Sequence, residues 1–204
     1  KQVLGGQVVI LTRPKESCAE LACALEDLGA RVRVLPTITI ATCELAGDTA
    51  ADVRAELSAG HYTGVIFTSA RAVTALINAL GRGPWNLPAF SVGPKTTRAL
   101  QPHWGGPTTQ ASEPLARGLV ETISAATPTP AQFLFACSTL ARPVIEEGLC
   151  EQGHQVTRLE LYETQPITDP LSPTPSLEPG AWVVVASPSA ARGLINSGLE
   201  LDHA

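Results

Sequence analysis

Short apolar runs alternate with longer segments of helical periodicity along most of the chain. Residues 8–11 (VVIL) have the length and composition of a strand buried on both faces. The next segment places apolar residues at helical spacing from Ala19 to Leu28, and Gly29 follows as a C-cap. Residues 64–80 repeat this succession. Further strands are predicted at 32–35, 89–92, 133–136, 156–162 and 182–185. This alternation predicts βαβ units in parallel sheets with helices on both faces.

Two pairs of segments repeat each other at long offsets. Residues 65–78 align with 183–196 at an offset of 118, and residues 9–32 align with 133–156 at an offset of 124. Offsets of this length indicate a duplicated half of a protein and not a solenoid. The alternative, that any two βα units look alike, stays open.

The repeat also bears on the C-terminal end. Adding 118 to residues 91–100 (SVGPKTTRAL) gives positions beyond Ala204, the last residue. We therefore expect the second half to lack its third βα unit and to leave one edge of its sheet unpaired. Unpaired edges and bare apolar faces favour association, so we expect this chain to be less stable than an extended one and to aggregate.

Composition and charge exclude several classes of protein. The chain is 44% hydrophobic and only 16% charged, which disfavours intrinsic disorder, and its net charge of −5 disfavours a nucleic-acid binder. Five cysteines without a Cys-x-x-Cys pair and four histidines without ligand spacing predict no metal site. No apolar run has the length of a membrane span. We expect a cytoplasmic monomer that binds neither nucleic acid nor membrane.

Candidate binding groups lie in four turns that each end a predicted strand and begin a helix. The turns are Thr12-Arg13-Pro14, Thr68-Ser69, Gly93-Pro94-Lys95-Thr96 and Ser187-Pro188-Ser189. Ligands of open parallel sheets bind outside the carboxyl ends of strands, and helix N-termini there suit carboxylates or phosphates. Taken singly, each Ser and Thr has the alternative of plain N-capping. Four such turns in one chain favour a pocket for a polyanion.

Two nucleotide-binding motifs are absent. The segment Gly93-Pro94-Lys95-Thr96 lacks the spacing of a P-loop and has proline where the second glycine should be. No Gly-x-Gly-x-x-Gly follows the first strand. We therefore expect no cofactor.

The order and spacing of five short motifs together resemble the uroporphyrinogen-III synthase family. These motifs are Leu11-Thr12-Arg13-Pro14, Val65-Ile66-Phe67-Thr68-Ser69-x-x-Ala72-Val73, Val92-Gly93-x-x-Thr96, Leu161-Tyr162-Glu163-Thr164 and Ser187-Pro188-Ser189. The resemblance implies two flavodoxin-like α/β domains, each a doubly wound parallel sheet, joined by a two-stranded linker. Mapped onto this chain, it groups residues 1–36 with 164–204 in one domain, incomplete at its C-terminal end, and gives 52–158 as the other. Residues 37–51 and 159–163 are then the linker strands, and the substrate is expected in the cleft between the domains.

The resemblance also implies a reaction. The family takes hydroxymethylbilane, expels its hydroxyl as water and closes the macrocycle while inverting ring D. By this resemblance Tyr162 and Thr96 are the candidate catalytic residues: Tyr162 is the hydrogen-bond donor to the leaving hydroxyl, and Thr96 matches a threonine of the cleft. Ser69 and Ser187 would bind acetate or propionate carboxylates and Arg13 and Lys95 would add charge. The remaining expected contacts to the substrate are Thr68, Gly93 and Ser189.

Other interpretations remain at this point. Tyr162 has the alternative of a core tyrosine with its hydroxyl at the surface. The whole chain has the alternative of a two-lobed, non-catalytic module that binds a small anionic ligand, or of an inactive homologue whose binding site serves another purpose.

Overall fold

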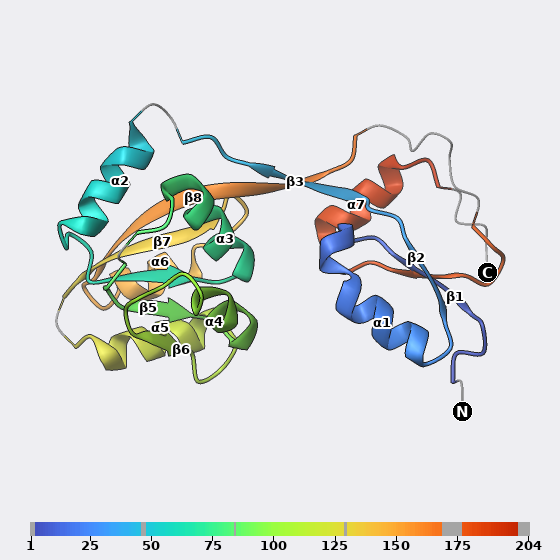
Figure 1. Cartoon of the computed structure of the whole chain (residues 1–204), viewed down its shortest axis with the longest axis horizontal. Coiled ribbons are helices and arrows are strands. Elements are labelled where there is room, and N and C mark those ends of the chain that lie inside the picture. Colours follow the sequence, from blue (N-terminus) through green and yellow to red (C-terminus); the bar gives the residue numbers. More distant parts are fainter. Residues whose placement is uncertain (1–2, 46–47, 84, 129, 169–176, 200–204) are drawn as a thin grey trace. The chain divides into compact units, whose positions relative to one another are not determined.

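A computed structural model of the chain describes residues 3–45, 48–83, 85–128, 130–168 and 177–199 (Figure 1). The chain divides into two compact units. Unit 1 comprises Lys1–Ala41 and Thr164–Ala204, and unit 2 comprises Thr42–Glu163. Unit 1 is therefore built from both ends of the chain.

Unit 1 has a sheet of three parallel strands in the order β2-β1-β9, formed by β1 (Val8–Leu11), β2 (Arg31–Val34) and β9 (Trp182–Val184). A short 3-10 helix η1 (Lys15–Ser17) and helix α1 (Ala19–Asp27) join β1 to β2, and α7 (Pro188–Asn196) follows β9. One buried cluster of this unit comprises Val9, Leu11, Cys18 and Ala30.

The apolar run 182–185 forms the predicted strand, β9, but this strand is only partly buried. β9 ends the order of the described sheet, Trp182 is 65% exposed and Val185 lies after the strand and is 41% exposed. An apolar run can therefore form a strand at the edge of a described sheet, because burial of a strand depends on its neighbours, which composition does not reveal.

Unit 2 carries a six-stranded sheet in the order β3-β8-β7-β4-β5-β6. The strands are β3 (Ile38–Thr42), β4 (Gly64–Phe67), β5 (Ala89–Ser91), β6 (Thr108–Gln110), β7 (Gln132–Ser138) and β8 (Gln155–Pro166). Neighbours from β8 to β6 are parallel. β3 and β8 are neighbours, and each continues across the boundary that divides the two units.

Helices cover both faces of this sheet (Figure 1). They are α2 (Thr49–Ser58), α3 (Ala70–Leu80), α4 (Pro94–Leu100), α5 (Ala116–Ala126) and α6 (Val144–Cys150). One core, around Phe67 and Leu76, packs under α2, α3 and α4, and the other, around Phe133 and Leu119, packs under α5 and α6. The doubly wound α/β architecture is therefore as predicted.

Strand pairing agrees with the internal repeat. In β1 and β2 Val9 is opposite Val32, and in β7 and β8 Phe133 is opposite Val156, which is the same pair moved by the offset of 124. Val9 is also opposite Trp182 in β9, and its counterpart Phe133 is opposite Gly64 in β4. Gly64 and Trp182 are 118 residues apart, which is the second offset. The two offsets found in the sequence thus match two strand registers, as a duplication predicts.

Some elements differ from the prediction. α2 begins at Thr49, inside the segment 37–51 assigned to a linker strand, and β8 runs without interruption through residues 159–163 to Pro166. β6 and α5 had not been predicted, because the stretch from Thr108 to Ala126 mixes polar residues into its apolar pattern. Most of the Pro-rich segment 166–179, expected to be a crossing loop, lies outside the described residues.

Candidate active site

The topology of unit 2 singles out the carboxyl ends of β4 and β7. From β4 the chain builds β5 and β6 on one side, and it then continues with β7 and β8 on the other side of β4. Neighbouring strands whose connections leave in opposite directions form a switch point, and ligands of open α/β sheets bind there. The turn Thr68-Ser69 follows β4, and the loop 139–143 follows β7.

Ser69 and Tyr162 meet at this switch point. Ser69 is the N-cap of α3, where its Oγ accepts the backbone N–H of Ala72 at 3.0 Å. The same Oγ lies 2.9 Å from the hydroxyl of Tyr162, and either oxygen can be the donor. Two residues that were predicted separately are thus in direct contact. Tyr162 is half-buried against the core of α3, so its ring packs as the core interpretation expected while its hydroxyl reaches the helix terminus.

A bulge in β8 turns Tyr162 toward Ser69. Successive side chains of a strand alternate between faces, so regular spacing would put Tyr162 on the face of Arg158 and Glu160. The register, however, shifts: Cys137 is opposite Glu160, but Ser138 is opposite Tyr162. One extra residue, Leu161, is therefore accommodated in β8, and both Leu161 and Tyr162 pack on the core under α3. The sequence holds no recognisable signal for this bulge.

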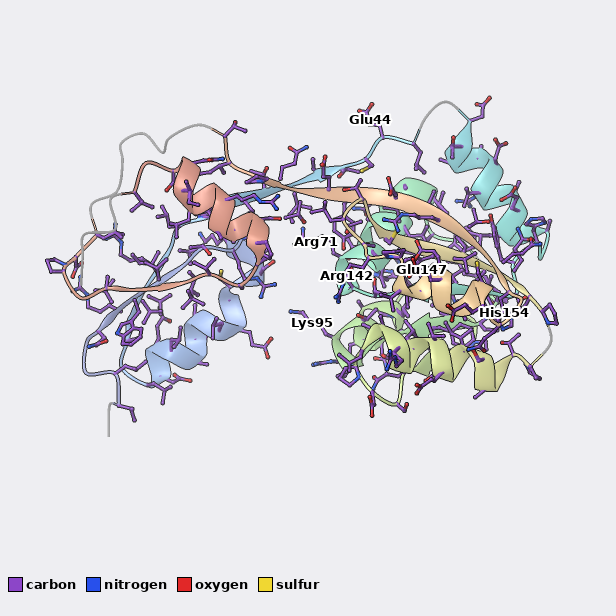
Figure 2. The ribbon with its side chains drawn as sticks, turned by 180° about the vertical axis from the view of Figure 1, so that it is seen from behind. Glu44, Arg71, Lys95, Arg142, Glu147 and His154 are labelled. Carbon is purple, nitrogen blue, oxygen red and sulfur yellow. The ribbon has the colours of Figure 1, made fainter. Side chains whose placement is uncertain are left out.

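Three cationic side chains lie at the same end of unit 2. Figure 2 shows Arg71, Lys95 and Arg142 where β4, β5 and β7 finish, away from His154. Lys95 and Arg142 are exposed, and Arg71 is half-buried in the first turn of α3. Only Lys95 had been predicted. The positions of the other two, in the segments that follow β4 and β7, were the signal that could have identified them.

The turn after β5 places its predicted residues differently. Thr96 is only 4% exposed, in the first turn of α4, and Gly93 is the buried N-cap of that helix. The hydroxyl contacts at this turn belong to Thr97, which had not been predicted. Its Oγ1 lies 2.7 Å from Ser91 Oγ and 2.9 Å from Gln110 Oε1. Thr68, after β4, is half-buried.

The equivalent turns of unit 1 follow adjacent strands. Arg13 is exposed after β1, and Ser187 is the N-cap of α7, where its Oγ accepts Ala190 N–H at 3.1 Å. Ser189 is half-buried in the first turn of α7. Thr37, which had not been predicted, fixes this end of the unit, because its buried hydroxyl donates to the carbonyl oxygens of Thr12 and Ala190. The expected cleft between the two domains stays a prediction.

Other side chains of the described segments give little sign of metal or thiol chemistry. Burial raises the pKa of the Cys137 thiol to about 12, so this sulfur at the end of β7 stays protonated and is a poor nucleophile. Among the residues that the structure describes, no three His, Cys, Asp or Glu side chains are grouped for a metal ion. The described helices are all too short or too polar to span a membrane.

Comparison with known proteins agrees with this fold. The chain is 28% identical over 204 residues to the chloroplastic uroporphyrinogen-III synthase of Oryza sativa subsp. japonica, covering 96% of this chain and 66% of the rice protein. Uroporphyrinogen-III synthetase of Helicobacter pylori shares its fold, with a TM-score of 0.63 and 17% identity, over 96% of this chain and 80% of that one. A mutant of the Thermus thermophilus enzyme gives a TM-score of 0.55 at 17% identity, over 80% of this chain and 64% of that one. The chain thus spans just under two thirds of the length of the rice and Thermus proteins.

A protein-family model described as uroporphyrinogen-III synthase HemD matches residues 19–200. This match includes both units and all of the turns discussed above except the one after β1. The chain belongs to the uroporphyrinogen-III synthase family.

Proposed function

We propose that this protein closes hydroxymethylbilane to uroporphyrinogen III, with loss of water and inversion of ring D. Membership of the family supports the reaction. One structural observation supports a specific role for a residue in this reaction. The Tyr162 hydroxyl is hydrogen-bonded to Ser69 at the switch point of the unit 2 sheet.

The pair suits the release of a hydroxyl group. Ser69 Oγ already accepts the N–H of Ala72, and it can direct its own proton to the oxygen of Tyr162. In that arrangement the phenolic O–H of Tyr162 is free to donate to the hydroxyl of the substrate. The electron-rich pyrrole expels this hydroxyl as water, so one well-placed donor is sufficient and the pathway includes no metal.

Lys95, Arg142 and Arg71 give the same end of unit 2 a local positive charge within a chain of net charge −5. Charge-assisted hydrogen bonds from such groups hold carboxylates well. We infer that these three cations bind acetate and propionate groups of the substrate, together with Thr68, Gly93 and Thr96 around the turns of β4 and β5. From unit 1, we infer that Arg13, Ser187 and Ser189 bind further carboxylates.

The main task of these contacts is orientation. A flexible tetrapyrrole can close through either of two carbons of ring D, and only a held geometry selects the one that inverts the ring. Many contacts to carboxylates are a means to hold that geometry. We further propose that the protein acts as a cytoplasmic monomer; sedimentation of the purified chain tests the first part and fractionation of cells tests the second.

The proposal is tested with freshly prepared hydroxymethylbilane. The chain is incubated with it, the products are oxidised to porphyrins, and the type I and type III isomers are separated. We expect type III to form in proportion to the concentration of protein. Binding of the tetrapyrrole without formation of type III would overturn the proposal and favour the non-catalytic binding module.

A further inference from the structure

Arg158 makes an unusual number of contacts for an arginine on a strand. Its Nη2 donates to three backbone carbonyl oxygens at the end of β7 and in the loop that follows, those of Ser138 at 3.1 Å, Thr139 at 3.2 Å and Ala141 at 3.1 Å. The side chain is largely buried, at 27% exposure. The planar guanidinium thus holds one segment of backbone by several hydrogen bonds at once, as a fork of donors can.

Two carboxylates hold that fork in place. Nη1 of Arg158 lies 2.6 Å from Oε1 of Glu146 on α6, and Nε lies 2.8 Å from Oε1 of Glu160 on β8. Within the described part of the chain, the other oxygen of Glu146, Oε2, is buried and has no partner. Removal of Arg158 would therefore leave a partly buried carboxylate without its counter-charge.

The tied segment is the one that opposes the bulge of β8. Ser138 is the residue opposite Tyr162, and the N–H of Thr139 donates to the Tyr162 carbonyl oxygen at 3.1 Å. The carbonyl oxygens of Ser138 and Thr139 both accept hydrogen bonds from Arg158. Arg158 therefore holds the backbone of Ser138 and Thr139, and this backbone pairs with Tyr162. The side chains of Arg158 and Tyr162 leave β8 on opposite faces.

We propose that Arg158 is a positioning residue, which keeps the bulge of β8 and so aims the Tyr162 hydroxyl at Ser69. As far as catalysis is concerned, this inference rests on the proposed function. Lysine should replace Arg158 poorly, because a single ammonium group cannot match a fork that serves three carbonyl oxygens and two carboxylates.

The position of Tyr162 can be followed without any assay of activity. The chain has two tyrosines, so labelling with 3-fluorotyrosine gives two fluorine resonances, and the one that Tyr162→Phe removes belongs to Tyr162. We expect Arg158→Met to move that resonance and to leave the resonance of Tyr62 in place. Arg158→Lys should move it by an intermediate amount.

The matched control is Arg31→Met. Arg31 also pairs with a glutamate, Glu178, but on an exposed surface of unit 1. This variant removes a cation and an ion pair as Arg158→Met does, and we expect both fluorine resonances to keep their positions.

Activity gives the second measurement. We expect Arg158→Met to lower kcat by about tenfold to a hundredfold, the scale of a misplaced group, while KM changes by less than about twofold. Arg158→Lys should recover part of kcat. An unchanged Tyr162 resonance together with wild-type kcat would overturn the inference.

The remaining outcomes are also decisive. If Arg158→Met does not fold, Arg158→Lys serves alone, and wild-type values of kcat and resonance in that variant overturn the inference. If the wild-type chain forms no type III isomer, the proposed function fails, yet the resonance still decides: a shift in the Arg158 variants supports the positioning role, and no shift overturns it.

Discussion

The duplicated segments β4–α3 and β9–α7 begin in the same way and end in different surroundings. Ser69 and Ser187 are both N-caps in extended conformation, with φ and ψ of −156° and 150° in one and −158° and 157° in the other. Each accepts the N–H of the residue three positions later, at 3.0 and 3.1 Å. The turn is therefore a local property of the repeated sequence, reproduced wherever the sequence occurs.

What surrounds the two turns is not shared. β4 lies between β7 and β5, and Val65, Ile66 and Phe67 are fully buried, whereas β9 ends its described sheet and exposes Trp182. Ser69 has Tyr162 as a partner; for Ser187 the described residues show only the bond from Ala190. The comparison teaches that a repeat can keep its cap while, among the described residues, the hydroxyl of that cap gains a side-chain contact in one copy.

The largest effect is expected where α7 departs from α3. Gly193 is equivalent to Ala75, and a Cβ at Gly193 would lie 1.7 Å from the backbone oxygen of Thr37. Because no rotamer relieves a clash with backbone, Gly193→Ala should cost ~3 kcal/mol or more of the free energy of unfolding. Denaturant titration with amide hydrogen exchange of unit 1 measures it.

The control for that substitution is the reverse change in the other copy. Ala75→Gly should cost ~1 kcal/mol through helix propensity, with a smaller loss from the methyl group that packs against the core. Equal losses in the two variants would show that the approach of α7 to Thr37 is not a fixed feature of the fold.

The next effect concerns Tyr162, the side-chain partner of Ser69. Tyr162→Phe should fold normally, since the ring is kept, and should lower kcat for the type III isomer by ~10²-fold, the typical loss for one donor to a transition state. Tyr62→Phe is the matched control, because Tyr62 also donates to a side chain, Glu56, at 2.8 Å but in the core. An unchanged rate in Tyr162→Phe would return Tyr162 to the role of a core residue.

Much of this site could be predicted from sequence, because much of it is local. The apolar runs at 8–11 and 64–67 are strands, and the serine turns after β4 and β9 are caps, since periodicity and capping act within a few residues. The likeness of 65–78 to 183–196 corresponds to equivalent strand pairs in the two sheets, Val9 with Trp182 and Phe133 with Gly64.

The rest depends on contacts between distant segments. No local pattern marks the bulge at Leu161 or the fork of Arg158, because both arise from the pairing of β8 with β7 and its loop. Thr96 was assigned by resemblance, yet packing leaves its side chain buried and gives the hydroxyl contacts to Thr97. Composition also does not show where β9 lies in its sheet, because an apolar run looks the same at the centre and at the edge of a sheet.

A smaller pair of effects compares the two caps directly. Ser69→Ala and Ser187→Ala should each cost ~1 kcal/mol by loss of the cap, seen as faster amide exchange at the first turns of α3 and α7. Their kinetics should differ. Ser69→Ala should lower kcat by about fivefold to tenfold, because Tyr162 loses a hydrogen bond of ~1 kcal/mol. Ser187→Ala should raise KM, as expected of a group that binds the substrate. A loss of kcat in both variants would show that the caps act alike.

The smallest effect is expected at Ile195, the counterpart of Ile77. Ile77 packs against the core of unit 2, whereas Ile195 is 80% exposed on α7. Ile195→Asn should therefore change the free energy of unfolding by less than ~0.5 kcal/mol, the usual range for a surface position. Ile77→Asn, which removes buried apolar area and places an amide beside the core, should cost at least ~1 kcal/mol. Thermal unfolding at several protein concentrations separates two causes, because Ile195→Asn should also reduce any association through the exposed face. If Ile195→Asn were as damaging as Ile77→Asn, Ile195 would be buried in solution, and the two copies of the repeat would be more alike than their structures indicate.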